Sequence, residues 1–150
     1  MKKPVYVLIA VSLVLVLLPA AATALFATDT MGCTPGYWKQ PQHESSWVNN
    51  WPTQTFSEVF GVGGEKTLFD ALETGGGGEE ALGRHAVAAL LNASNLDVGY
   101  LYTVDEVIAI VQGAYNSGDF ETAKNQLEVQ NELDCPLGRG PAETPTEVPA

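Results

Sequence analysis

The stretch that decides the fold reads EEALGRHAVAALLNA and runs from Glu79 to Ala93. Its apolar residues recur at helical spacing, which predicts a helix with one apolar face. Glu79 and Glu80 lie in the first turn, where negative charge suits the positive end of the helix dipole. The stretch therefore predicts the strongest helix of the chain. The residues of its apolar face are Leu82, Ala86, Ala89, Leu90 and Ala93.

Three further helices are predicted on either side of this one. Thr103–Glu106 is a capping box and predicts the start of a second long helix, which carries an apolar stripe. Asn116–Gly118 is predicted to end this helix. Asp119–Leu133 predicts a third long helix. Upstream, a second capping box predicts a short helix over 67–73, which ends at the glycine run Gly75–Gly78. We therefore expect a small all-α domain with three main helices, no internal repeat and no strand.

Residues 33–57 form an aromatic entry segment interrupted by prolines. The prolines exclude a long helix, so we expect an irregular loop with short turns and one helical turn near Glu44–Asn49. Tryptophan in a small helical domain usually fills the core, and Trp38 beside Cys33 is the best candidate for that role. Trp47 and Trp51 are better candidates for exposure. The candidate ligand-binding residues are Tyr37, Trp38, Trp47 and Trp51.

Cys33 and Cys135 bracket the predicted helices and are the only cysteines of the chain. In a protein that leaves the cytoplasm, such a pair is expected to form a disulfide. The ends of a domain are often close in space, so we expect the two Cα atoms to lie about 4.4–6.8 Å apart. The alternative is two free or intermolecularly paired thiols.

The N-terminus has the order of a secretory signal: Lys2 and Lys3, then an apolar core, then small residues. We predict a signal peptide over 1–24, a short linker over 25–32, a disulfide-closed domain over 33–137 and a disordered tail over 138–150, rich in Pro, Thr and Glu. The alternative is an uncleaved N-terminal anchor over 5–26. Both alternatives place the domain outside the cytoplasm, extracellular or at the cell surface.

The chain is strongly acidic, with a net charge of −11. Loss of Lys2 and Lys3 with a cleaved signal would lower its 7 basic residues to 5 against 18 acidic ones, a net charge of −13. Such a surface repels nucleic acid and anionic lipid. We expect no nucleic-acid partner, and a membrane contact only through an uncleaved N-terminal segment. The expected partner is an extracellular protein or a glycan.

Motifs of catalysis and metal binding are scarce in this sequence. His43 and His85 could form a metal site with nearby glutamates, but no His-Glu-x-x-His or paired-cysteine spacing is present, and structural histidines are the favoured interpretation. No Gly-x-Ser-x-Gly elbow occurs. No cofactor is expected. Asn92-Ala93-Ser94 is an N-glycosylation sequon at a predicted helix end, where an exposed Asn92 could carry a glycan.

The opening run Cys33-Thr34-Pro35-Gly36-Tyr37-Trp38-Lys39 resembles a family of secreted and cell-surface domains that begin Cys-Thr-Pro-Gly-Tyr/Phe-Trp-Lys. The similarity continues through 67–72 and 82–93 and closes with Cys135-Pro136-Leu137, so it covers nearly the whole domain. The resemblance implies a cell-surface setting in exported bacterial or archaeal proteins. It implies no particular activity.

Three functions are compatible with these features. The first is an exported, non-enzymatic domain with an interaction or structural role outside the cell. The second is a glycan-binding module that uses exposed tryptophans. The third is a small extracellular hydrolase, in which His43 and His85 would serve a metal-dependent reaction.

Overall fold

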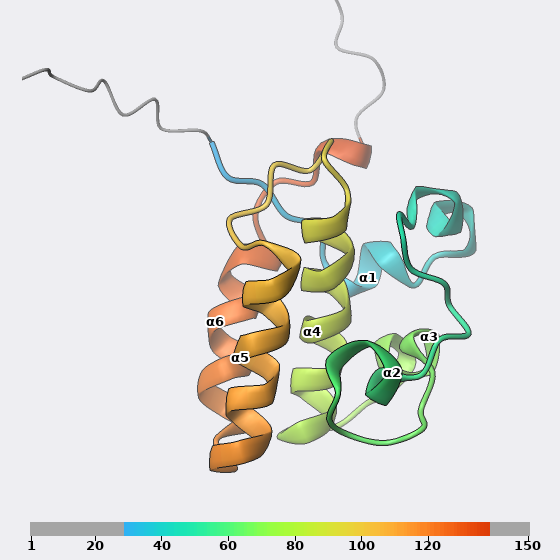
Figure 1. Ribbon diagram of the computed structural model, residues 1–150. Helices are drawn as coiled ribbons and strands as arrows, with labels where there is room; N and C mark the ends of the chain where they lie inside the picture. Colours follow the sequence, from blue (N-terminus) through green and yellow to red (C-terminus); the bar gives the residue numbers. More distant parts are fainter. Residues whose placement is uncertain (1–28, 139–150) are drawn as a thin grey trace, which may run out of the picture.

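The computed structural model describes residues 29–138 and shows a bundle of helices joined by loops (Figure 1). The predicted all-α class is confirmed, since these residues contain no β-strand; one isolated antiparallel bridge joins Thr55 and Thr67. The predicted signal peptide, the anchor alternative and the tail beyond Gly138 lie outside the described residues. Within 29–138, no helix combines the length and the hydrophobicity needed to cross a membrane.

The three predicted long helices are confirmed, and the last ends at Asn131, two residues before its predicted end. The helices, in chain order, are α1 (Pro35–Trp38), the 3-10 helix η1 (Pro41–Ser46), α2 (Phe56–Phe60), α3 (Leu68–Glu73), α4 (Glu79–Ser94), α5 (Val104–Ser117), α6 (Phe120–Asn131) and the 3-10 helix η2 (Pro136–Gly138).

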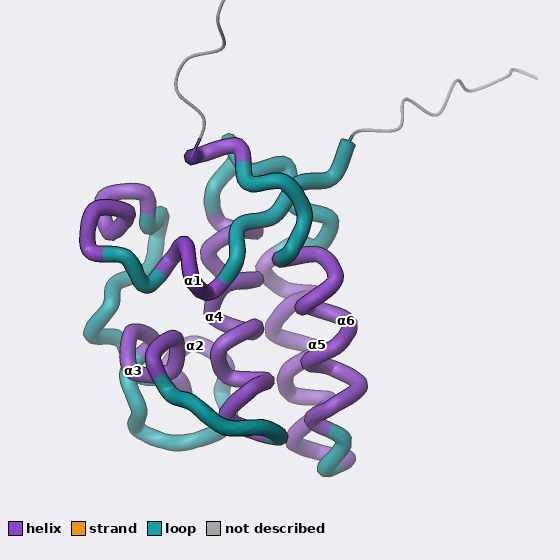
Figure 2. The backbone as a smooth tube through the Cα atoms, turned by 180° about the vertical axis from the view of Figure 1, so that it is seen from behind, coloured by secondary structure: helices purple, strands orange, loops and turns teal. Residues whose placement is uncertain are grey.

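Helix α4 runs through the middle of the molecule, with α5 and α6 on one side and α1 and α3 on the other (Figures 1 and 2). Its burial extends around the whole circumference, because every residue from His85 to Asn92 is buried. The prediction of a single apolar face is therefore wrong. A helix surrounded by neighbours has no solvent side, and the small side chains Ala86, Ala88 and Ala89 allow those neighbours to approach closely.

Local capping chemistry sets most of the helix ends. Thr103 and Glu106 exchange both hydrogen bonds of the predicted capping box, and Gly118 ends α5 in the left-handed conformation with φ 77°. Thr67 caps α3 by accepting a hydrogen bond from the backbone of Asp70. A further capping box at Thr55 opens α2, which the sequence analysis did not predict although its Thr-x-x-Glu pattern is present.

The aromatic entry segment is more ordered than predicted. Pro35 and Pro41 each stand in the first turn of a short helix, where a missing N–H costs nothing, so the prolines begin helices here. The helical turn expected near Glu44–Asn49 is the 3-10 helix η1, which begins and ends three residues earlier.

The predicted disulfide is confirmed, with the Cα atoms of Cys33 and Cys135 4.5 Å apart. It joins the entry segment to the chain beyond α6. Gly32 is buried, and the Met31 amide donates to the carbonyl of Gly99 at 3.3 Å. The last residues of the predicted linker therefore belong to the packed domain. Both ends of the described chain lie at the same end of the bundle, opposite the N-terminus of α4 (Figure 1).

Candidate functional site

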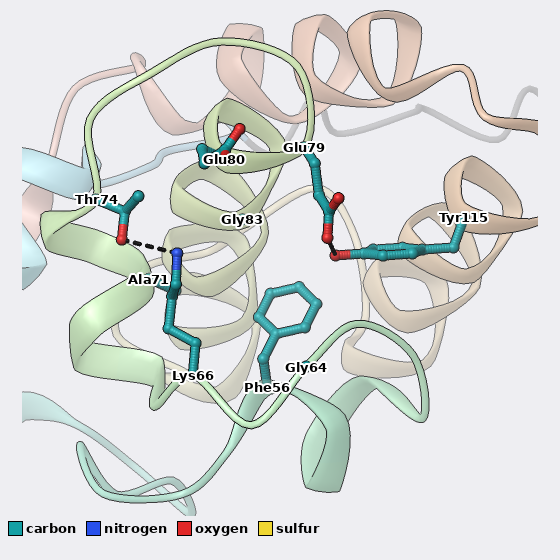
Figure 3. Close-up of a pocket in the computed structure, with 9 residues that line it drawn as sticks. All are labelled: Phe56, Gly64, Lys66, Ala71, Thr74, Glu79, Glu80, Gly83 and Tyr115. Atoms are coloured by element: carbon teal, nitrogen blue, oxygen red, sulfur yellow. Dashed lines mark hydrogen bonds between the residues drawn. The ribbon is translucent and has the colours of Figure 1, made fainter.

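A pocket of about 190 Å³ opens at the end of the bundle where α4 begins (Figure 3). Its walls come from α2, α3, α4, α5 and the loop between α2 and α3. It is lined by Phe56, Gly64, Lys66, Ala71, Thr74, Glu79, Glu80, Gly83 and Tyr115. Of these residues, the sequence had suggested only Glu79 and Glu80, as possible metal ligands beside His43 and His85.

The isolated bridge between Thr55 and Thr67 positions the pocket's floor and one wall. The Phe56 amide donates to the carbonyl of Lys66, and the Leu68 amide donates to the carbonyl of Gln54, both at 2.8 Å. The starts of α2 and α3 are therefore held side by side. Phe56 and Lys66 enter the pocket from these paired segments.

The floor of the pocket is apolar. The Phe56 ring stacks on Phe60 with 4.3 Å between centroids, and its side chain is 4% exposed. Ala71 and Gly83 continue this floor from α3 and α4. Figure 3 shows the Phe56 ring between Lys66 on one side and Tyr115 on the other.

The rim of the pocket is polar and charged. The hydroxyl of Tyr115 donates to Glu79 Oε1 at 2.9 Å, and burial together with this bond raises the pKa of Tyr115. On the opposite side, Lys66 Nζ donates to Thr74 Oγ1 at 3.1 Å. Within residues 29–138, neither Lys66 nor Glu79 nor Glu80 forms an ion pair.

The glycine run at the start of α4 is held in place by Arg84. Its guanidinium donates to the carbonyl of Thr74 at 2.6 Å and to the carbonyl of Gly76 at 2.9 Å. Gly76 and Gly78 have φ values of 112° and 58°, which side chains rarely adopt. The glycines therefore permit a turn that Arg84 ties back to the pocket wall.

A second cluster is buried at the other end of the bundle, beside the disulfide. Asn92 Oδ1 accepts from the Cys33 amide and from the Trp38 indole, both at 3.0 Å. Its Nδ2 donates to the Cys33 carbonyl at 2.9 Å and to Asn131 Oδ1 at 3.0 Å. All four hydrogen-bonding positions of the amide are thus used. The prediction of an exposed, glycosylated Asn92 is wrong, because this side chain is fully buried.

Asn131 extends the buried cluster to two more parts of the chain. Its Oδ1 also accepts from the Tyr100 hydroxyl at 2.8 Å, and its Nδ2 donates to the backbone carbonyl of His85 at 2.9 Å. Burial raises the pKa of Tyr100, so its hydroxyl stays a donor. This cluster has a structural role, since its polar groups satisfy one another. Asn92 and Tyr100 also line a second, more open pocket of about 200 Å³.

The structure gives the two histidines different partners. His43 stacks on the ring of Tyr37 with 3.8 Å between centroids. His85 is buried, with Nε2 3.5 Å from Glu128 Oε1, and burial lowers its pKa below the usual value of 6.5. Among the described residues, no group of three or more His, Cys, Asp or Glu side chains is arranged to hold a metal ion.

The three tryptophans differ sharply in exposure. Trp38 is 1% exposed, so it fills the core, as the sequence predicted, and it has no surface for a ligand. Trp47 is only partly exposed, and its indole N–H donates to the carbonyl of Trp38 at 3.4 Å. Trp51 is 61% exposed. Of the four candidate ligand-binding aromatic residues, Trp51 alone presents most of its side chain to solvent.

No family model, curated protein or solved structure matches this chain. The resemblance to cell-surface domains that open with Cys-Thr-Pro-Gly-Tyr/Phe-Trp-Lys therefore stays a prediction. The one sequence signal that could have pointed to the pocket is Gly83, an isolated glycine inside the strongest helix.

Proposed function

We propose that this protein is an exported, non-enzymatic domain with an interaction role outside the cytoplasm, secreted or held at the cell surface. The observation that carries the proposal is the disulfide between Cys33 and Cys135, which closes the domain end to end. Disulfides form and persist in oxidising compartments and are rare in the cytosol. A domain whose two ends are joined in this way is suited to the cell exterior.

The surroundings of the disulfide strengthen this argument. Cys33 is fully buried, and Asn92 binds both its amide and its carbonyl. The bonded arrangement is therefore part of the core. In addition, the positively charged and apolar N-terminal pattern precedes the domain and has the order of an export signal.

The positions of the chain ends are consistent with a tethered or displayed module. Residues 29 and 138 lie at one end of the bundle, and the start of α4, which lines the pocket, lies at the other (Figure 1). Attachment through the N-terminal segment would thus leave the pocket pointing away from the point of attachment. The acidic surface favours partners that carry positive charge or none.

The test is to express the full chain in a bacterial host, separate the cell fractions and determine the state of the thiols by non-reducing mass spectrometry. We expect the protein outside the cytoplasm with Cys33 bonded to Cys135. The control is Leu15→Arg, which places a charge in the apolar core of the signal and should leave a reduced protein in the cytoplasm. Cytoplasmic location of the unaltered chain would contradict the proposal.

A second candidate function, glycan binding, is favoured by Trp51. Asn50 donates to Ser94 Oγ at 3.0 Å, and Asn95 donates to the carbonyl of Ser46 at 3.1 Å, so the segment that carries Trp51 is bound to the end of α4. Val48 on the same segment is 37% exposed. An exposed indole on a fixed segment can stack on the apolar face of a sugar ring.

Titration of polysaccharides with intrinsic tryptophan fluorescence as the readout tests this candidate. A response that Trp51→Ala removes, and that Leu96→Ala leaves intact, would support it. Leu96 is the matched control because it is 96% exposed and lies on a different loop. The absence of any fluorescence response across a broad polysaccharide panel would exclude it.

A further inference from the structure

We propose that the pocket at the start of α4 binds a small zwitterion, with the carboxylate of the ligand at Lys66 and its ammonium group at Glu79 and Glu80. The ligand's apolar part would lie over Phe56. This inference names a ligand class for the proposed interaction role and rests on that role only for its biological setting.

The first argument is the charge arrangement. Lys66 and the two glutamates stand on different walls of one pocket, with the Phe56 ring between Lys66 and Glu79 (Figure 3). No ion pair joins them within the described part of the chain. Unpaired charges of opposite sign on facing walls are complementary to a molecule that carries both charges at its two ends.

The second argument is the hydrogen bonding of these groups. Lys66 Nζ uses one of its three donors on Thr74, which directs the ammonium group and leaves two donors for a carboxylate. Glu79 accepts from the Tyr115 hydroxyl through Oε1, which leaves Oε2 for a ligand ammonium. Both charged groups are therefore oriented by a neighbour and still have free capacity.

The third argument is the size of the pocket and the apolar character of its floor. The pocket holds about 190 Å³, below the roughly 300–1,000 Å³ typical of sites for drug-sized ligands. It therefore suits a molecule of about the size of an amino acid. Phe56 and Ala71 are each 4% exposed and give the floor an apolar, close-packed surface for a short hydrocarbon segment.

The fourth argument is Gly83, which lies in the interior of α4. A Cβ atom added there would meet no atom within 4 Å, so packing within the domain does not require glycine. Glycine in a helix interior is less stable than alanine. The missing side chain instead leaves open the volume that a ligand would occupy.

The experiment titrates the purified, disulfide-bonded domain with 6-aminohexanoate, L-leucine, hexylamine and hexanoate, and follows backbone amide shifts by NMR. We expect 6-aminohexanoate, which carries its charges at its two ends, to shift the amides of Glu79 and Gly83. We expect L-leucine, hexylamine and hexanoate to bind about three- to fivefold more weakly, as expected for loss of one solvent-accessible ion pair. Equal affinity for hexylamine would overturn the zwitterion in favour of a simple cation site. No shifts with any of the four probes would overturn the site itself.

Matched variants test whether the ligand binds in this pocket. Gly83→Leu should abolish the shifts by filling the pocket. Gly113→Leu should not, because Gly113 also has no atom within 4 Å of an added Cβ but lies on α5 outside the pocket. Lys66→Gln and Glu79→Gln should each weaken binding of the zwitterion about three- to fivefold, whereas Lys39→Gln should leave it unchanged. Unchanged binding in Gly83→Leu would overturn the proposal.

The failure of this inference is distinguishable from failure of the proposed function. Binding is measured on purified protein, whereas export and disulfide formation are measured in cell fractions. If no ligand binds, the results on export and disulfide formation still stand.

Discussion

Asn92 binds both backbone hydrogen-bonding groups of Cys33: its Oδ1 accepts from the Cys33 amide at 3.0 Å, and its Nδ2 donates to the Cys33 carbonyl at 2.9 Å. The two residues are 59 positions apart in the chain. The side-chain amide of Asn92 thus satisfies the backbone of Cys33 where the chain enters the core beside α4. The disulfide is thus positioned by the central helix as well as by the two cysteines.

We predict that Asn92→Ala lowers the free energy of unfolding by about 3–5 kcal/mol. The substitution leaves the Cys33 amide and carbonyl and the Trp38 indole buried without partners, and each unsatisfied group costs roughly 1–3 kcal/mol. Urea denaturation under oxidising conditions measures the change. Asn116→Ala, at an exposed site on α5, is the control and should change stability by less than about 0.5 kcal/mol. A loss below about 1 kcal/mol for Asn92→Ala would show that the cluster is not decisive.

We predict that removal of the disulfide by the double variant Cys33→Ala/Cys135→Ala destabilises the domain by about 4–5 kcal/mol. The bond closes a loop across a sequence separation of 102 and restricts the unfolded chain. Thermal and urea unfolding of the variant should match those of the unaltered protein after full reduction. If reduction leaves the unfolding midpoint where it was, the bond contributes nothing to stability.

We predict that His85 makes the domain less stable in mild acid. Burial lowers the pKa of His85 below 6.5, and Glu128 opposes this shift only in part. The unfolded chain therefore binds a proton at a pH where the folded imidazole stays neutral. The free energy of unfolding should fall as the pH drops below about 6.5 and level off below the folded pKa. Charged groups that act on this imidazole are Glu128, Lys124, Arg84 and Glu132.

The measurement for His85 compares urea midpoints at about pH 7.5 and about pH 5.5, on the two sides of the unfolded pKa. His85→Gln should lose stability less steeply between these two values than the unaltered protein. A variant with the same pH dependence as the unaltered protein would rule out His85 as the titrating group.

We predict that Gly32→Ala is strongly destabilising, although nothing about Gly32 in the sequence distinguishes it from a linker residue. A Cβ at this position would collide with the backbone carbonyl of Gln130 near the end of α6, and a backbone atom cannot yield as a flexible side chain can. The expected loss is about 1–3 kcal/mol, as for overpacking in a core. Gly113→Ala should instead gain about 0.5–1 kcal/mol, because alanine is preferred in a helix interior. Equal melting temperatures for the two variants would contradict this account.

Much of the secondary structure could be predicted because its signals are local. The hydroxyl of Thr103 bonds an amide three residues away, and Gly118 adopts its left-handed turn within the same helix end. Such interactions depend on a few neighbouring residues, so their pattern is visible in the chain itself. The prolines of the entry segment were misjudged, because proline is compatible both with a loop and with the first turn of a helix.

The candidate pocket could not be predicted, because its residues come from four helices and a loop. Lys66 and Glu79 line the same pocket only because α3 and α4 pack beside α2 and α5. The role of Asn92 could not be predicted either, because in the sequence it begins a glycosylation motif at a predicted helix end. Its buried role requires Cys33 and Trp38 on one side and Asn131 on the other.

The sequence by itself determined the all-α class and the approximate extents of the long helices, because these follow from short-range hydrogen bonding and from side-chain periodicity. It also left a single intramolecular pairing for the only two cysteines. Only the tertiary structure decided that α4 is surrounded on all sides, that Trp51 is exposed while Trp38 is buried, and that Lys66 and Glu79 line one pocket on either side of Phe56. Those properties depend on how helices far apart in the chain pack together, and a residue's own identity does not specify which neighbours it will meet.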